Sequence, residues 1–382
     1  QFNTDEFSCK IAGYISNDEN NANYFDISSY LDNKEIKRND RFIQYGIVAA
    51  KMAVEDSGIE NLSEEDKLNT GVIVGSGIGG LAMIEATRDT FQKSGSRRIS
   101  PFFVPASIIN MISGNLSIKY GFKGPNLSIV TACTTGTHNI GEGFRQIQYS
   151  HADVMICGGA EMAASPLGIG GFAAARALST RNDDPEKASR PWDIDRDGFV
   201  LGDGAGVLVL EELEHAKARG ANIYGEIIGY GMSADAFHMT LPSEDGDGAK
   251  RCMNNALNDA EIKPEDVGYI NAHGTSTPAG DVVEVRAIKS LFGEHSKNLT
   301  INSTKSMIGH LLGAAGGVEA LVTILSLKNQ KIHPTINVDN QDPECDLDFN
   351  TKSSKDANIN IALSNSFGFG GTNGSLIFSK YD

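Results

Sequence analysis

Basic residues are scarce in this sequence compared with acidic ones. Its 382 residues include 33 Lys and Arg against 49 Asp and Glu, which gives a formal net charge of −16. Nucleic acids and anionic membrane surfaces are bound by clustered cations, so we expect neither as a partner. An acidic protein partner would have to be attracted by local basic clusters.

Cysteine is scarce as well. The five cysteines are odd in number and far apart, so they fit neither a disulfide framework nor a zinc site, and we expect no metal. Unpaired thiols predict a reducing compartment, which is the cytoplasm in a bacterium and a plastid or mitochondrion in a eukaryote.

Long apolar runs are almost missing. Residues 308–327 are the best candidate for a membrane span, but His310, Glu319 and several glycines interrupt them, so we predict a buried helix there. Hydrophobic residues make up 40% and charged residues 21%, which is typical of a large globular protein.

Short apolar runs alternate with helical patterns along the chain. After a polar, Asn/Asp-rich opening, regular structure is predicted to begin near Arg41 with a helix over 42–54. Strands are predicted at 71–74, 127–133, 153–159, 206–211, 223–230, 269–273 and 299–305, with a helix at 309–327. This pattern indicates a largely parallel α/β protein. Similar strand, turn and helix units in both halves suggest a duplication, with a boundary near residue 222.

Cys133 follows an apolar run and precedes a helix that begins with Thr134, Thr135, Gly136 and Thr137. The partial positive charge of a helix N-terminus would stabilise a thiolate and lower the thiol pKa. The backbone N–H groups there could also hold an oxyanion. A buried structural cysteine remains the alternative on position alone.

Two histidines lie in glycine-rich segments after predicted strands: His273 in Asn271-Ala-His-Gly-Thr-Ser-Thr-Pro and His310 in Ser306-Met-Ile-Gly-His. The ends of parallel strands are where α/β proteins place their sites. One cysteine with two histidines points to acyl transfer, although each histidine alone could be a structural residue.

Lys305 lies beside an apolar stretch and needs a carboxylate partner, for which Glu319 is the candidate. His310 and Glu319 are nine positions apart, which places them on opposite faces of a helix, so they are not expected to pair.

Two glycine-rich segments allow more than one interpretation. Residues 365–374 read as a loop that covers a site and places Phe369 as a gate, or alternatively as a strained hairpin between terminal strands. Residues 75–80 fit a dinucleotide fingerprint, but the expected second strand with its acidic end is missing, so a nicotinamide site is disfavoured.

Several long motifs occur in the same order as in a known family. They include Thr131-Ala-Cys-Thr-Thr-Gly-Thr-His-Asn, Arg190-Pro-Trp-Asp, Asn271-Ala-His-Gly-Thr-Ser-Thr-Pro and Ser303-Thr-Lys-Ser-Met-Ile-Gly-His-Leu-Leu-Gly. Over nearly its whole length, the chain resembles the β-ketoacyl-acyl-carrier-protein synthases of fatty-acid synthesis, most closely the type II elongating enzymes.

The resemblance implies an α/β, thiolase-like fold with two pseudo-symmetric α/β halves in a five-layered αβαβα arrangement, assembled as a homodimer. The N-terminal half, 1–221, would carry the nucleophile, and the C-terminal half, 222–382, the two histidines. The family opens with a strand of the type Val-Val-Val-Thr-Gly that has no counterpart in this sequence. One sheet should therefore be a strand short.

The resemblance also implies the chemistry. Cys133 would take an acyl group from acyl carrier protein, with its own N–H and that of Phe369 as the oxyanion hole. His273 and His310 would assist decarboxylation of a malonyl group on the same carrier, and the resulting enolate would attack the thioester. Lys305 and Glu319 would form a supporting ion pair.

Substrate contacts follow from the same resemblance. The pantetheine tunnel would be lined by Thr275, Thr277 and Thr240, and the acyl pocket by Ile78, Phe172 and Phe369. Carrier docking would use Arg97, Arg98, Arg176, Lys34, Lys37 and Arg38. No cofactor is implied beyond the phosphopantetheine of the carrier, and a structural monovalent cation is left open.

Three related classes remain for comparison. A polyketide-type ketosynthase shares the cysteine and both histidines and is the main alternative. A degradative thiolase would need a second cysteine near the C-terminus, where this chain has Gly368 and Gly370. A non-catalytic chain-length factor would lack Cys133.

Overall fold

The computed structural model describes residues 2–22 and 24–381. The opening segment is mostly irregular, with one short helix, α1 (Asn33–Arg38). Longer regular structure begins as predicted with α2 (Arg41–Ser57), which Asp40 caps at its N-terminus and Gly58 ends at φ 72°.

The first sheet has the strand order β2-β1-β3-β4. Strand β1 (Thr70–Gly75) runs parallel to both β2 (Asn126–Leu127) and β3 (Val154–Glu161), whereas β4 (Gly204–Glu211) is antiparallel to β3. Both β1 and β3 are buried along their whole length. Helices α2 and α6 (Met111–Tyr120) pack on the outer face of this sheet.

The second sheet has the order β5-β11-β10-β6-β7. Strands β6 (Tyr269–Asn271) and β7 (Thr300–Asn302) are parallel to each other, and β6 is parallel to β10 (Ile361–Gly368). Strand β11 (Thr372–Ser379) is antiparallel to β10 and to β5 (Glu226–Ala234). Helices α10 (Asp247–Asp259) and α11 (Pro278–Phe292) cover its outer side.

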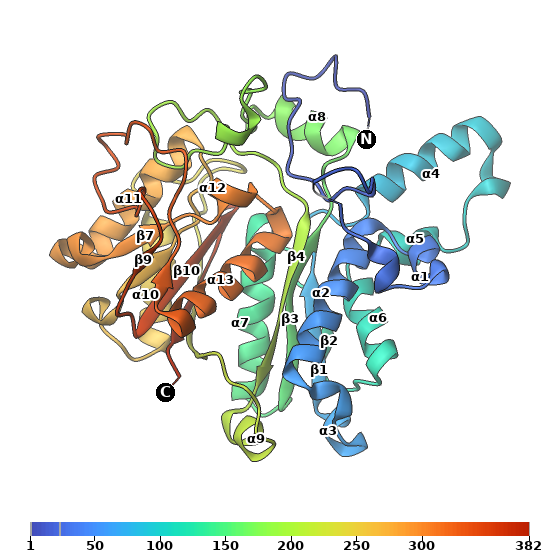
Figure 1. The fold of residues 1–382 in the computed structure, drawn as a ribbon, viewed down its shortest axis with the longest axis horizontal. Helices are drawn as coiled ribbons and strands as arrows, with labels where there is room; N and C mark the ends of the chain where they lie inside the picture. Colours follow the sequence, from blue (N-terminus) through green and yellow to red (C-terminus); the bar gives the residue numbers. More distant parts are fainter. Residues whose placement is uncertain (1, 23, 382) are drawn as a thin grey trace.

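Two helices fill the space between the sheets, α7 (Thr135–Gln148) and α13 (Ala315–Asn329) (Figure 1). They pack closely where they begin, because a Cβ on Gly136 would lie 2.6 Å from the Gly317 nitrogen. Outer helices, sheet, central helices, sheet and outer helices give five layers, which confirms the predicted arrangement.

The two sheets repeat one pattern with one difference. Each contains three parallel strands followed by an antiparallel one, and the second sheet adds β5 beyond β11. Within the described residues, the outer edge of β4 has no such strand, so the first sheet is a strand short as predicted. The expectation of largely parallel sheets is wrong, because both are mixed.

Two predicted elements differ in extent. Only Asn126–Leu127 of the segment before Cys133 pairs as a strand, since the chain after Leu127 leaves the ladder to form the turn that carries the cysteine. Residues 365–374 belong mostly to β10 and β11, so the hairpin interpretation is right and the loop shrinks to Phe369–Gly371. Eight residue pairs face each other across this hairpin and define its register, despite its glycines.

The remaining elements are short or peripheral. They are α3 (Glu64–Leu68), α4 (Leu81–Ser94), α5 (Phe103–Ser107), α8 (Pro166–Ala174), α9 (Leu213–Ala218), α12 (Lys305–Ile308), β8 (Lys331–Ile332) and β9 (Lys355–Asp356). No helix among the described residues is both long and apolar enough to cross a membrane. The segment 308–327 lies largely within α13, as expected.

Candidate active site

Cys133 lies in a tight turn between the first sheet and α7. A 3-10 turn, Ala132–Thr134, leads directly into the helix, and Ala132 has a left-handed φ of 49°. Such a backbone is costly for alanine and persists because the surrounding structure fixes it. Cys133 is 8% exposed and lines a cavity through which a thioester can approach its thiol.

The electrostatics of Cys133 differ from the sequence prediction. Burial raises the pKa of the thiol to about 11, although the charge of Lys305 and the backbone N–H groups of Phe369 and of Cys133 itself favour the thiolate. The predicted lowering of the thiol pKa is therefore wrong, because desolvation outweighs these favourable interactions. The resting residue is a thiol whose sulfur faces two backbone N–H donors.

His310 is held by one hydrogen bond from its main chain and one to its ring. Its backbone N–H donates to the Val200 carbonyl at 2.7 Å, and its ring Nδ1 accepts from the Leu312 N–H at 3.3 Å. Because Nδ1 accepts, the neutral ring carries its proton on Nε2. The residue is 2% exposed, and burial holds its pKa well below the ordinary value.

His273 follows β6 and faces His310. The ring centroids are 5.3 Å apart at an interplanar angle of 87°. Glu284 holds the backbone of this turn, since its carboxylate accepts from the N–H groups of His273 and Gly274, each at 2.9 Å. Burial lowers the pKa of His273, with the charge of Lys305 as a further cause, so both rings are neutral at pH 7.

The predicted Lys305 and Glu319 pair forms a buried ion pair. The Lys305 ammonium donates to Glu319 Oε1, and each side chain is 1% exposed. Burial raises the pKa of Glu319 to about 7 while Lys305 opposes that change. A cation thus lies beside the cysteine and both histidines, where it favours a thiolate and neutral imidazoles.

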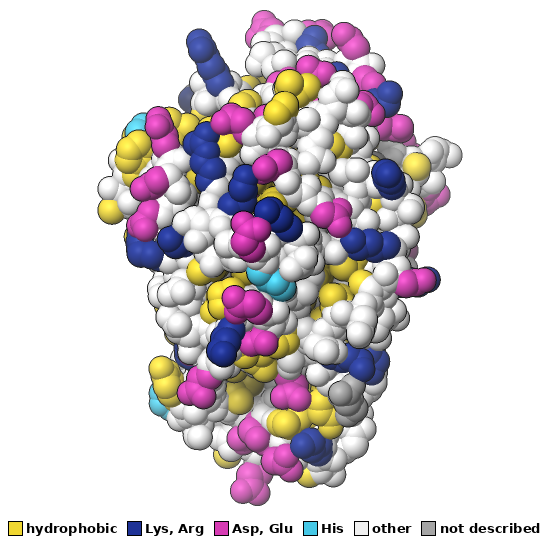
Figure 2. All heavy atoms as spheres, turned by 90° about the vertical axis from the view of Figure 1, so that its left-hand side faces the viewer, with side chains coloured by type: hydrophobic (Ala, Val, Ile, Leu, Met, Phe, Trp, Pro, Cys, Tyr) yellow, Lys and Arg dark blue, Asp and Glu magenta, His cyan; other side chains and the backbone are white. Residues whose placement is uncertain are grey.

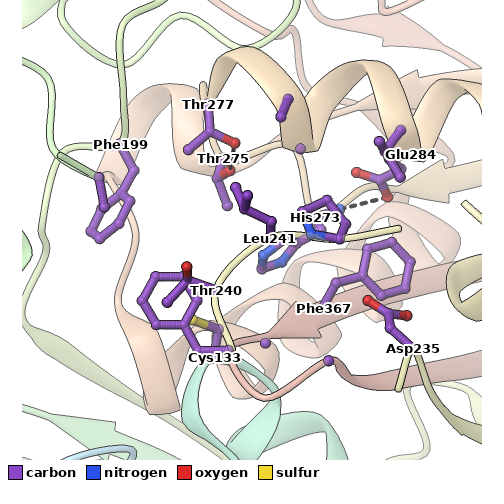
Figure 3. Close-up of a pocket in the computed structure, with 18 of the residues that line it drawn as sticks. Cys133, Phe199, Asp235, Thr240, Leu241, His273, Thr275, Thr277, Glu284 and Phe367 are labelled. Atoms are coloured by element: carbon purple, nitrogen blue, oxygen red, sulfur yellow. Dashed lines mark hydrogen bonds between the residues drawn. The ribbon is translucent and has the colours of Figure 1, made fainter. Parts of the chain in front are cut away.

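Cys133, His273 and His310 line one cavity of about 290 Å³. Figure 3 shows Cys133 and His273 facing one space, with Thr275 and Thr277 on the adjoining wall and Glu284 behind His273. Predicted site residues that line this cavity are Cys133, His273, His310, Phe369, Phe172, Thr240, Thr275, Thr277 and Arg176.

Other predicted site residues lie elsewhere. Ile78 borders a separate open hollow with Ile108 and Val130. Arg97 and Arg98 follow α4, and Lys34, Lys37 and Arg38 lie on α1; all five are exposed. The Arg38 guanidinium lies 4.6 Å from the centre of the Phe102 ring, so α1 contacts the segment that follows Arg97 and Arg98.

Several residues of the cavity wall were not predicted from the sequence. Phe199 packs against His310 with ring centroids 5.1 Å apart, and Phe367 packs against His273 at 5.7 Å. Asp235 and Glu284 add carboxylates. Glu284 lies on α11 one turn beyond Asp281, and this helical spacing could have predicted that it shares the face turned toward His273. No sequence pattern pointed to Phe199 or Phe367. No group of three or more metal-ligating side chains occurs within the described residues.

Comparison with known proteins agrees with this geometry. Residues 2–216 match the β-ketoacyl synthase N-terminal domain and residues 224–339 match the corresponding C-terminal domain. The chain belongs to the β-ketoacyl synthase family. It is a condensing enzyme of the acyltransferase class, as its similarity to curated relatives shows. It is 55% identical to 3-oxoacyl-[acyl-carrier-protein] synthase 2 of Vibrio harveyi, over 99% of this chain and 90% of that protein. Identity to the enzyme of the same name from Vibrio cholerae is 56%, with the same coverage.

Solved structures of ketosynthases share the fold. A β-ketoacyl synthase from Burkholderia phymatum has a TM-score of 0.88 and 34% identity, covering 98% of this chain and 89% of its own. A type II polyketide ketosynthase, solved in complex with its acyl carrier protein, has a TM-score of 0.87 and 37% identity over 90% of this chain and 85% of its own. The higher identity to the fatty-acid enzymes favours that activity over the polyketide alternative.

Proposed function

We propose that this β-ketoacyl synthase elongates fatty acids with Cys133 as the acyl carrier and His273 and His310 as the groups that act on malonyl-acyl-carrier protein. The observation that carries the proposal is the shared cavity. One thiol and two neutral imidazoles line it, and two backbone N–H groups face the sulfur.

In the first half-reaction, the Cys133 sulfur attacks the thioester carbon of an acyl group on its carrier. The N–H groups of Cys133 and Phe369 stabilise the oxyanion, and collapse expels the phosphopantetheine thiolate. The proton of the Cys133 thiol ends on that departing sulfur. Because the thiol pKa is about 11, this transfer needs a base, and the neutral ring of His273 can serve, since His310 already carries its proton on Nε2.

In the second half-reaction, malonyl-acyl-carrier protein loses carbon dioxide and leaves an enolate on the thioester oxygen. His310 donates to that oxygen from Nε2, and His273 assists from the facing ring. The enolate carbon attacks the acyl thioester on Cys133, and the product 3-oxoacyl group leaves on the carrier. The Cys133 thiolate then takes one proton from solvent, which completes the balance.

Phosphopantetheine would reach the cysteine along the wall formed by Thr240, Thr275 and Thr277. The hydroxyls of Thr275 and Thr277 are 3.0 Å apart, so they present one polar edge to the arm's amides. Phe172 and Phe369, with ring centroids 6.2 Å apart, would bound the acyl end. The arm arrives with the carrier, so no resident cofactor is needed, and a structural monovalent cation remains a prediction.

Carrier docking would use two basic regions. Arg176 lies at the cavity. Lys34, Lys37 and Arg38 lie on α1, which contacts the segment after Arg97 and Arg98 through Arg38 and Phe102. Figure 2 shows the side of the molecule that lies at the left in Figure 1, where acidic and basic side chains are interspersed. A related ketosynthase was solved with its acyl carrier protein, which supports the same class of partner here.

A homodimer is the assembly we propose, formed across β2. This strand is a free edge, and Leu127, Val130 and Ile108 beside it are 46%, 47% and 42% exposed. A second copy would bury these side chains and close the hollow that contains Ile78. Sedimentation velocity that finds only monomers at micromolar concentration would contradict this assembly.

We place the protein in the bacterial cytoplasm. The relatives named above are bacterial, and the five cysteines, all unpaired, suit a reducing compartment. Fractionation of the source cells would test the location.

Intact-protein mass spectrometry tests the activity most directly. After incubation with a long-chain acyl carrier protein, the enzyme should gain the mass of one acyl group, and Cys133→Ala should gain none. Cys252→Ala is the matched control, since that thiol is also buried but lies outside the cavity. An adduct on Cys133→Ala, or none on the unaltered enzyme, would contradict the assignment.

A further inference from the structure

Glu161 is a buried carboxylate that the proposed chemistry does not use. It ends β3 and is 0% exposed. Its Oε1 accepts from the Ser76 hydroxyl at 2.6 Å and the Ile78 N–H at 3.2 Å. Its Oε2 accepts from the N–H groups of Gly77 at 2.7 Å and Gly313 at 2.9 Å. Four hydrogen-bond donors on one buried carboxylate indicate that this side chain fixes the position of the segments that donate to it.

The hydrogen bonds define Glu161 as an anion. The Ser76 hydroxyl already accepts from the Gly79 N–H at 3.0 Å, so its own hydrogen points to Glu161. Every partner of the carboxylate therefore donates, which favours the charged form. Burial raises the pKa of Glu161 while these hydrogen bonds lower it.

The carboxylate connects the two halves of the chain at the site. Gly77 and Ile78 follow β1, whereas Gly313 lies in the 3-10 turn Leu312–Ala314 that begins α13. The preceding residue, Leu312, has a left-handed φ of 47° and donates its N–H to Nδ1 of His310. A strained turn of this kind needs an external restraint, and the bond from Gly313 to Glu161 supplies one.

We propose that Glu161 is a positioning residue for His310. By holding the Gly313 N–H, its carboxylate keeps the Leu312 N–H on Nδ1 of His310, and the imidazole proton therefore stays on Nε2. This inference rests on the proposed function, because it assigns the role of His310 to donation from Nε2. It adds a residue that touches neither substrate nor the reacting atoms.

Two substitutions separate the bond to Gly313 from the negative charge. In Glu161→Gln, the amide oxygen keeps Gly77 and Gly313, and the amide nitrogen can face Ser76, whose hydroxyl can rotate to accept. Only the longer bond from the Ile78 N–H, at 3.2 Å, loses its acceptor. In Glu161→Ala, the Gly313 N–H loses its acceptor. Glu212→Ala is the matched control, since Glu212 also accepts a backbone N–H, from His215 at 2.8 Å, but lies at the start of α9 outside the cavity.

The first measurement compares the half-reactions. Glu161→Ala should lower the kcat of malonyl decarboxylation about 10- to 100-fold, which is less than the roughly 100- to 10,000-fold lost when an acid or base is itself removed, while Cys133 still takes the acyl group. Glu161→Gln and Glu212→Ala should stay within about threefold of the unaltered enzyme. Equal losses in both half-reactions, or an equal loss in Glu161→Gln, would overturn the proposal.

The second measurement reads the tautomer directly. Nitrogen-15 NMR of histidine-labelled enzyme should show His310 protonated on Nε2 in the unaltered protein and in Glu161→Gln, and a mixture of tautomers in Glu161→Ala. Should Glu161→Ala not fold, Glu161→Asp, which keeps the charge but is one methylene too short, replaces it. An unchanged tautomer in the folded variant would overturn the inference, whereas absence of any acyl adduct on the unaltered enzyme would overturn the proposed function instead.

Discussion

The turns that begin the two central helices are built alike and serve different ends. In each, a residue with a left-handed φ, Ala132 at 49° or Leu312 at 47°, begins a 3-10 turn that runs into a helix. The following residue is Cys133 in the first turn and Gly313 in the second. The same backbone turn therefore carries a nucleophile in the first half of the chain and a structural glycine in the second.

What faces the backbone amides distinguishes the two turns. At the first, the N–H groups of Cys133 and Phe369 face the sulfur and the cavity. At the second, the carboxylate of Glu161 occupies the Gly313 N–H. An amide left free for an incoming oxyanion can support catalysis, whereas one bonded to an internal anion can only hold structure. The predictions below test this contrast, starting with the largest expected effect.

Removal of Lys305, the buried cation beside the first turn, should have the largest effect on stability. Lys305→Ala leaves Glu319 buried without its partner, which should lower the free energy of unfolding by about 3–5 kcal/mol. Chemical denaturation measures this loss. Lys289→Ala is the matched control, because its ion pair with Asp346 at 2.7 Å is exposed, and its stability should not change measurably. A loss in Lys305→Ala no larger than in the control would show that the pair adds nothing.

A side chain added where the two turns approach each other should have an intermediate effect on stability. Gly136→Ala places a Cβ 2.6 Å from the Gly317 nitrogen, and the backbone there must shift, so we expect a loss of about 1–3 kcal/mol in unfolding free energy. Gly171→Ala is the control, since a Cβ there meets nothing within 4 Å and alanine favours its helix by about 0.5–1 kcal/mol. Thermal unfolding that ranks the two variants in the opposite order would contradict the close approach.

The pH response of the decarboxylation half-reaction should be the smallest effect. Burial lowers the pKa of His273 and His310 well below 6.5, so both rings stay neutral as pH falls from about 8 to 6, and kcat should change less than about twofold. Unfolded histidines take up protons near pH 6.5, so the contribution of these neutral rings to stability is lost as pH falls below that value. A decarboxylation profile with an apparent pKa near 6.5 would show that the rings titrate normally.

Much of the site was predictable because short motifs fix local geometry. Cys133 before a helix of small residues, and His273 after a strand, are patterns with a direct structural meaning. Glu161 was missed since it bonds to Ser76 and to Gly313, 85 and 152 positions away, and no local pattern encodes such partners. The thiol pKa was predicted in the wrong direction because burial of Cys133 depends on the whole fold.

The hydroxyl of Thr134 hydrogen-bonds to the Ser366 carbonyl, 232 positions later in the chain. The turn beside Cys133 is therefore completed only when nearly the last strand is in place. During synthesis on the ribosome, the thiol can emerge and its helix can form long before that contact exists. Contacts so distant in sequence form late in folding, so activity should appear as the final event of maturation rather than with the first half.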